Sequence, residues 1–125
     1  MLGDKKANAT IPVKDLKVAK RFYEGTLELK PAPNEQQQVV VYPTSGSTIF
    51  VYESQYAGTN KATAITWTVG PDVERIAKAL KAKGVVFEHY DFPNTKLEGD
   101  VHVMGRMKMA WFKDPDGNIH NIVSG

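Results

Sequence analysis

A chain of 125 residues is long enough for one hydrophobic core and too short for two independent domains. Its 42% hydrophobic and 24% charged residues are typical of a globular protein, and a net charge of +2 with Lys and Glu interspersed predicts no nucleic-acid partner. The absence of cysteine excludes disulfides, thiolate metal sites and cysteine nucleophiles. Because the sequence has neither a long apolar run nor the apolar stretch of a secretion signal, we expect a cytoplasmic protein without a membrane partner.

The first half of the chain predicts a strand, a helix and three further strands. Residues 8–13, which contain the alternating segment ATIPV, form the first strand. Asp15 is expected to cap the helix, and Gly25 is expected to end it in a left-handed conformation. The segments LELKP, QQQVVVYP and STIFVYES predict three strands, with residues 44–47 as the hairpin turn between the last two.

The second half repeats this order after a polar connection at residues 54–61. The segment ATAITWTV predicts a strand, and a helix follows that begins near Pro71 and ends at Gly84. The segments VVFEHY, RMKMAWFK and NIHNIV predict three more strands, the last two joined by a DPDGN turn. Residues 91–105 predict a long irregular loop, and such loops are often either lids of ligand sites or disordered.

The repeat predicts an α+β fold made of two βαβββ modules, at about residues 7–53 and 62–124, within a single domain at residues 1–125. A strand, crossover helix and return strand favour right-handed packing, which places the helix on one face of each sheet. We therefore expect an open, eight-stranded, barrel-like sheet around a cavity, with the helices outside.

The repeat also resembles a known family. Together with the segments VKDLKVAKRFY and FKDPDGN, it is similar to the vicinal oxygen chelate superfamily, which includes glyoxalase I, fosfomycin and bleomycin resistance proteins, and extradiol dioxygenases. The resemblance covers nearly the whole chain, and GVVFEHYDFP with AWFKDPDGN is closest to the small glyoxalase-like members. It implies a small-molecule ligand and a homodimer.

Catalytic members of this superfamily commonly hold one divalent metal, with ligands from strands one, four, five and eight. Carried over to this sequence, these positions fall on Asn8, Val51, Ala64 and Asn121, the middle two to within one residue. None has an ionisable donor, whereas such sites are usually built from carboxylates and imidazoles. The resemblance therefore predicts that the family metal site is lost, and we predict no cofactor.

The histidines do not restore a metal site in this interpretation. By strand alternation His120 should face the helix layer, and His89 is expected at the surface. His102, in the long loop, could swing over the cavity and is a candidate acid or base. Glu53 is a second catalytic candidate, facing inward only if the strand register differs by two residues.

If Asn121 faces the cavity as the family ligand does, its neighbours define a soft apolar pocket for a small aromatic or aliphatic molecule. In this pocket Asn8 or Asn121 would orient a polar group of the ligand by hydrogen bonding. The predicted ligand-binding residues are Asn8, Thr10, Thr66 or its neighbour Trp67, Met107, Met109, Trp111 and Asn121.

Three functions of different classes follow. The sequence favours a glyoxalase/bleomycin-resistance-like protein that binds a small organic molecule without the family metal. The alternative is a divalent-metal-dependent lyase, isomerase or dioxygenase with unrecognised ligands, which would involve Glu53 or His102. The third is a structural or regulatory module whose interior is filled by its own Met and Trp side chains.

Overall fold

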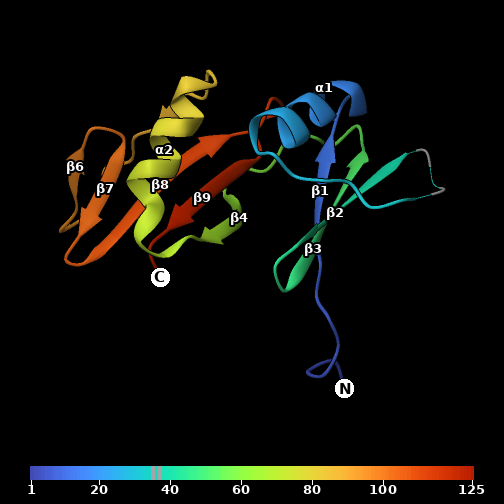
Figure 1. The fold of residues 1–125 in the computed structure, drawn as a ribbon, viewed down its shortest axis with the longest axis horizontal. Helices are drawn as coiled ribbons and strands as arrows, with labels where there is room; N and C mark the ends of the chain where they lie inside the picture. Colours follow the sequence, from blue (N-terminus) through green and yellow to red (C-terminus); the bar gives the residue numbers. More distant parts are fainter. Residues whose placement is uncertain (35, 37) are drawn as a thin grey trace. The chain divides into compact units, whose positions relative to one another are not determined.

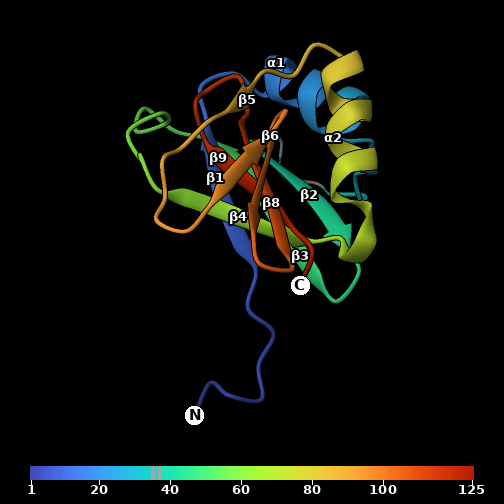
Figure 2. The same ribbon diagram turned by 90° about the vertical axis from the view of Figure 1, so that its left-hand side faces the viewer.

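The computed structural model describes residues 1–34, 36 and 38–125. The chain forms two compact units, residues 1–59 and 60–125, which we describe separately (Figures 1 and 2). Position 37, within the predicted strand QQQVVVYP, lies outside the described residues.

The first unit is a three-stranded sheet with one helix. Strands β1 (Ala9–Val13), β2 (Val39–Thr44) and β3 (Ser47–Glu53) lie in the order β1-β3-β2, with β1 parallel and β2 antiparallel to β3. Helix α1 (Leu16–Lys20) continues into a wider π-type turn, η1 (Arg21–Thr26). Asp15 caps α1 as predicted, because its Oδ1 accepts a hydrogen bond of 2.8 Å from the backbone N–H of Lys17.

The core of this unit lies on the face of the sheet that packs against the helix. Ile11, Val13 and Val51 are buried on this face, and the ring of Tyr42 stacks on that of Tyr23 in η1 at 5.9 Å. Burial, with the hydrogen bond that the Tyr42 hydroxyl donates to the Glu24 carboxylate, raises the Tyr42 pKa well above its usual value.

Two predictions for this unit are wrong. Gly25 does not end the helix, because η1 runs on to Thr26, and the residue with a positive φ is Glu28, at 62°. The segment LELKP does not form a strand, and a hydrogen bond of 2.8 Å from Ala32 N to Val41 O links the following residues to β2. The prolonged helical turn and the left-handed residue occupy the positions that an extended strand would need.

The second unit is a six-stranded sheet with one face covered by a helix, α2 (Val73–Ala82) (Figure 1). The strand order is β4-β9-β8-β7-β6, with β5 paired to β8, and β4 parallel to β9. The bounds are β4 (Thr63–Thr68), β5 (Phe87–Glu88), β6 (Lys96–Glu98), β7 (Val101–Met104), β8 (Met107–Lys113) and β9 (Ile119–Val123). As predicted, Pro71 starts the helical region in the short η2 turn (Gly70–Asp72), and Gly84 follows α2 with φ of 93°.

The predicted long loop at residues 91–105 contains a hairpin, so this prediction is wrong. Strands β6 and β7 pair with each other, and β7 pairs with β8, with His102 opposite Met109. His102 is therefore a strand residue, 1% exposed, and it does not swing on a loop.

The DPDGN turn joins β8 to β9 and is closed by its own side chains. Asp114 Oδ1 accepts hydrogen bonds of 2.9 Å from the backbone N–H groups of Asp116 and Asn118, and Asp114 Oδ2 accepts one of 2.7 Å from Asn118 Nδ2. Gly117 has a φ of 89°, which a residue without a Cβ adopts without strain. The turn sets the register of β8 and β9 and hence the position of Asn121.

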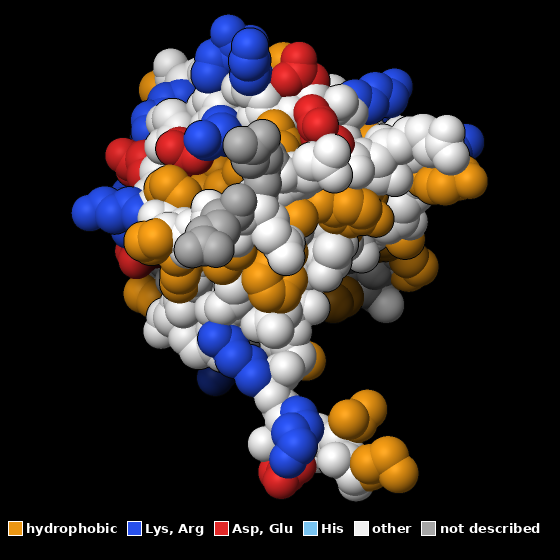
Figure 3. Space-filling model, turned by 90° about the vertical axis from the view of Figure 1, so that its right-hand side faces the viewer, with side chains coloured by type: hydrophobic (Ala, Val, Ile, Leu, Met, Phe, Trp, Pro, Cys, Tyr) orange, Lys and Arg blue, Asp and Glu red, His pale blue; other side chains and the backbone are white. Residues whose placement is uncertain are grey.

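The described residues thus form an α+β fold of two sheets with three and six strands, without a closed barrel. The second module has the predicted order as β4, α2, β5, β8 and β9, with the β6–β7 hairpin added. On the face displayed in Figure 3, basic and acidic side chains are interspersed with hydrophobic ones. Within the described part of the chain, no helix combines the length and apolar character needed to cross a membrane.

Candidate functional site

Five of the predicted ligand-binding residues share one face of the second sheet. Asn121 lies opposite Trp111 of β8 on one side and Thr66 of β4 on the other. Met107 and Met109 follow on the same face because side chains alternate along β8. We call Thr66, Met107, Met109, Trp111 and Asn121 the binding face; it is the face opposite α2.

The α2-facing side of this sheet contains His120, as strand alternation predicts. His120 is completely buried between Phe112, whose ring lies 4.9 Å away at 13°, and Trp67, whose Nε1 donates a hydrogen bond of 3.0 Å to His120 Nδ1. Burial lowers the His120 pKa to about 4, and the charge of Asp114 opposes this shift. Of the two residues predicted at the β4 position, Thr66 therefore belongs to the binding face, and Trp67 is half-buried on the side of His120.

Trp111 is the centre of an aromatic cluster. Its ring centroid lies 5.4 Å from that of Tyr90, 5.3 Å from that of Phe92 and 4.9 Å from that of His102, and Trp111 is 8% exposed. Sequence reasoning missed Tyr90 and Phe92, although the aromatic density of the segment HYDFP was a visible signal. The rings of this cluster pack against Trp111 at one end of the binding face. Little of the Trp111 ring is therefore left for contact with a ligand.

Asn121 carries the unusual feature of the binding face. Its side-chain Oδ1 is buried, and it accepts no hydrogen bond from any of the described residues. A buried polar atom without a partner costs roughly 1–3 kcal/mol, and native folds retain few of them. Such an acceptor is well suited to a ligand that brings its own donor.

The predicted site residues of the first unit are divided between the two faces of its sheet. Thr10 shares the face away from α1 with Phe50 and Tyr52, and Asn8 precedes β1 and is exposed. Val51 is fully buried on the face toward α1.

Glu53, the second predicted catalytic candidate, contacts the start of helix α1. Its Oε2 accepts a hydrogen bond of 3.2 Å from the backbone N–H of Leu16, at the start of α1, and its backbone partner is Val13. The carboxylate thus satisfies a free donor of the first helical turn.

The residues present do not fit a divalent metal at the family position. Asn8 and Asn121 offer only neutral amide oxygens, Val51 has no donor, and Ala64, at a bulge between β4 and β9, also has none. Among the described residues, no group of three or more His, Cys, Asp or Glu is placed to hold a metal ion. We therefore assign no chemical step to a metal.

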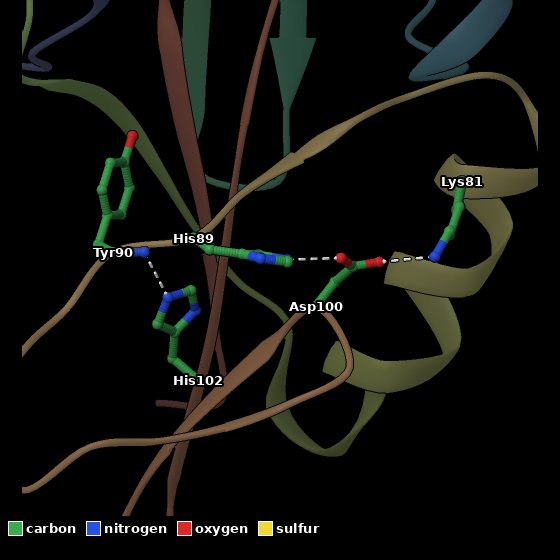
Figure 4. Close-up of polar contacts among 5 residues, drawn as sticks. All are labelled: Lys81, His89, Tyr90, Asp100 and His102. Atoms are coloured by element: carbon green, nitrogen blue, oxygen red, sulfur yellow. Dashed lines mark hydrogen bonds and ion pairs between the residues drawn. The ribbon is translucent and has the colours of Figure 1, made fainter.

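A cluster of polar side chains lies between the residues that follow β5 and the β6–β7 hairpin (Figure 4). His102 Nε2 accepts a hydrogen bond of 2.9 Å from the backbone N–H of Tyr90. His89 Nε2 lies 2.8 Å from Asp100 Oδ1, and Lys81 Nζ lies 3.2 Å from Asp100 Oδ2. The hydrogen bond with His89 lowers the Asp100 pKa and Lys81 adds to the effect, while burial opposes it.

Comparison with known proteins gives one family. The family model described as glyoxalase/bleomycin resistance protein/dioxygenase superfamily matches residues 7–122. No curated protein matches significantly in sequence.

Similar solved structures cover almost the whole chain. An integron cassette protein from the mobile metagenome of the Halifax Harbour sewage outfall has 16% identity and a TM-score of 0.72, over 98% of this chain and 99% of that chain. The fosfomycin resistance protein FosX from Listeria monocytogenes has 18% identity and a TM-score of 0.73, over 95% and 91%. A glyoxalase/bleomycin resistance protein/dioxygenase from Alicyclobacillus acidocaldarius has 18% identity and a TM-score of 0.69, over 96% and 90%.

Proposed function

The chain belongs to the glyoxalase/bleomycin resistance protein/dioxygenase superfamily, and we propose that it binds a small organic molecule on the binding face of its second sheet without the usual family metal. The observation that carries this proposal is the buried Asn121 Oδ1, which lacks a donor among the described residues. A ligand with an N–H or O–H group would satisfy this acceptor.

The surroundings of Asn121 favour a ligand with a compact apolar body. Met107 and Met109 are half-buried on the same face, and unbranched thioether side chains adapt to irregular apolar shapes. Burying apolar ligand surface against them would contribute roughly 25 cal/mol per Å². Affinity would then come from apolar burial, while Asn121 would set orientation.

The side chains at the expected metal-ligand positions support binding rather than catalysis. The positions that hold a metal in catalytic relatives carry neutral or apolar side chains here, and Glu53 contacts the start of α1. Resistance to fosfomycin and bleomycin, named for similar proteins, favours a small xenobiotic or metabolite as the ligand class.

A matched pair of probes tests the role of Asn121. We expect indole, which has an N–H donor, to bind the protein about tenfold more tightly than indene, which has the same shape without the donor. Asn121→Leu should remove this preference and raise the free energy of unfolding by about 1 kcal/mol, because it removes a buried polar atom without a partner. Dissociation constants from NMR titration and urea unfolding measure the two effects.

Val123→Ala is the control, because Val123 lies two residues further along β9 on the same face and has no polar group. The control should keep the preference for indole. Equal binding of the two probes to the wild-type protein, or an Asn121→Leu variant that still prefers indole, would contradict the proposal.

Metal content tests the other half of the proposal. Protein purified without chelators is expected to contain Mn, Fe, Co, Ni and Zn well below one ion per chain by elemental analysis, before and after incubation with each ion. A stoichiometric ion would contradict metal independence and direct the search toward lyase and dioxygenase substrates.

A further inference from the structure

We infer that the second unit contains a separate site for a small, neutral carbonyl compound, next to the β6–β7 hairpin. The site is a cleft of about 270 Å³ lined by His89, Tyr90, Asp91, Thr95, Leu97 and His102. None of these residues is one of the five that define the binding face, although Tyr90 and His102 contact Trp111 at its edge. The inference uses a different polar atom from the proposed function, and the variants below separate the two.

The hydrogen bond between Tyr90 and His102 fixes the tautomer of the imidazole. A backbone N–H can only donate, so His102 Nε2, which accepts from Tyr90 N at 2.9 Å, carries no proton. A neutral imidazole keeps its proton on the other nitrogen. His102 Nδ1 is therefore an N–H donor.

This donor has no partner in the described part of the chain. His102 Nδ1 is buried and makes no hydrogen bond to these residues, and the whole side chain is 1% exposed. Figure 4 shows Nδ1 on the side of the ring toward His89, which also lines the cleft. Because a buried donor without an acceptor is costly, the site is complementary to a ligand that supplies an acceptor oxygen.

Charges around the cleft favour a neutral ligand over an anion. Asp91 contributes a carboxylate to the cleft wall, whereas the nearby cations Lys81 and Lys113 are engaged with Asp100 and Glu88. Burial, helped by the charge of Glu88, raises the Tyr90 pKa, so its phenol stays uncharged. A carbonyl group accepts from His102 without bringing a second negative charge next to Asp91, and an amide N–H could also donate to that carboxylate.

The size of the cleft sets the size of the ligand. Its volume of about 270 Å³ is just below the roughly 300–1,000 Å³ of pockets for drug-sized molecules. The rings of Tyr90 and His89 and the side chain of Leu97 offer apolar walls. A single ring with a carboxamide substituent therefore fits both the volume and the polar groups.

The test uses benzamide as the neutral carbonyl probe, benzoate as the anionic probe and toluene as the apolar probe. Benzamide should bind with a dissociation constant of about 1 mM, ordinary for a ligand of this size. Benzoate and toluene should each bind at least tenfold more weakly. Tighter binding of benzoate than benzamide would overturn the inference of a neutral ligand.

The imidazole itself gives a second readout that needs no variant. A long-range ¹H–¹⁵N correlation spectrum should show the Nδ1–H tautomer of His102 in the free protein, and benzamide should shift this proton. The Nε2–H tautomer, or a His102 resonance unaffected by saturating benzamide, would overturn the inference.

His102→Gln separates the donor from the fold. The glutamine carbonyl can reach the position of Nε2 and accept from Tyr90 N, while the Nδ1–H donor is lost. We expect benzamide to bind this variant at least tenfold more weakly. The control Lys61→Gln, at an exposed residue that does not line the cleft, should stay within threefold of wild type. Unchanged benzamide affinity in His102→Gln would overturn the inference.

The two proposals fail separately. If this inference is right, His102→Gln should leave the indole preference of the binding face intact, and Asn121→Leu should leave benzamide affinity intact. Loss of benzamide binding in Asn121→Leu would place the carbonyl compound on the binding face and overturn the separate site.

Discussion

Asp114→Ala is expected to lower the free energy of unfolding by about 3 kcal/mol, because it leaves several buried donors of the DPDGN turn without an acceptor. The Asp114 carboxylate is 4% exposed and accepts from Asp116 N, Asn118 N and Asn118 Nδ2. Each donor left without a partner in a buried turn costs roughly 1–3 kcal/mol. Urea unfolding followed by circular dichroism measures the change.

Asp114→Asn provides a graded comparison. An asparagine keeps one acceptor oxygen for the backbone donors, but it cannot accept from Asn118 Nδ2 with its amide nitrogen. We expect it to lose about 1 kcal/mol. The exposed Asp4, which forms an ion pair with its neighbour Lys5, is the control, and Asp4→Ala should stay within about 0.5 kcal/mol of wild type. Equal losses in Asp114→Ala and Asp114→Asn would mean that charge, and not hydrogen bonding, is what the turn requires.

Features that depend on local chemistry were predicted correctly from the sequence. Asp15 caps α1, Pro71 begins the helical region before α2, and Gly84 follows α2 in a left-handed conformation. Each outcome follows from the backbone preference or hydrogen bonding of a single residue, so no knowledge of distant contacts is needed.

Features that depend on pairing between distant segments were not predicted correctly from the sequence. Strands β6 and β7 have three and four residues, and the sequence around them contains Pro93 and Gly99, which suggested a loop. Pairing of β7 with β8 is what makes His102 a buried strand residue. The lost strand at LELKP has a related cause, because η1 extends the helical turn further than helical periodicity indicated.

The candidate site also contains residues whose placement was predicted correctly and positions that need the observed strand pairing. The family resemblance placed the methionines of the binding face with Asn121, and the register of β8 and β9 puts them on one face. Alternation along β9 placed His120 on the other side, as observed. Counting residues from a motif placed the strand-four position on Val51 to within one residue, and Val51 itself faces α1. A shift of one residue along a strand reverses the face, so such counting cannot assign a ligand without the observed register.

The second large effect expected is a loss of stability below neutral pH caused by His120. Burial holds the His120 pKa at about 4 in the folded protein, below the value of 6.5 for an exposed imidazole. Between these two pH values the unfolded chain binds a proton that the folded protein does not bind. The contribution of His120 to the free energy of unfolding should therefore be constant above about pH 7. Below pH 6.5 it should fall by about 1.4 kcal/mol per pH unit, so that about 3 kcal/mol is lost near pH 4.

His120→Asn isolates this contribution, because the asparagine can still accept from Trp67 Nε1 and does not titrate. The variant should be less stable than wild type at pH 7.5, since it removes the ring that stacks on Phe112. The difference should shrink by about 3 kcal/mol as the pH falls to 4, because only the wild type loses the His120 contribution. Parallel pH profiles of the two proteins, or an NMR titration of the His120 ring with a midpoint near 6.5, would show that the buried imidazole does not control acid stability.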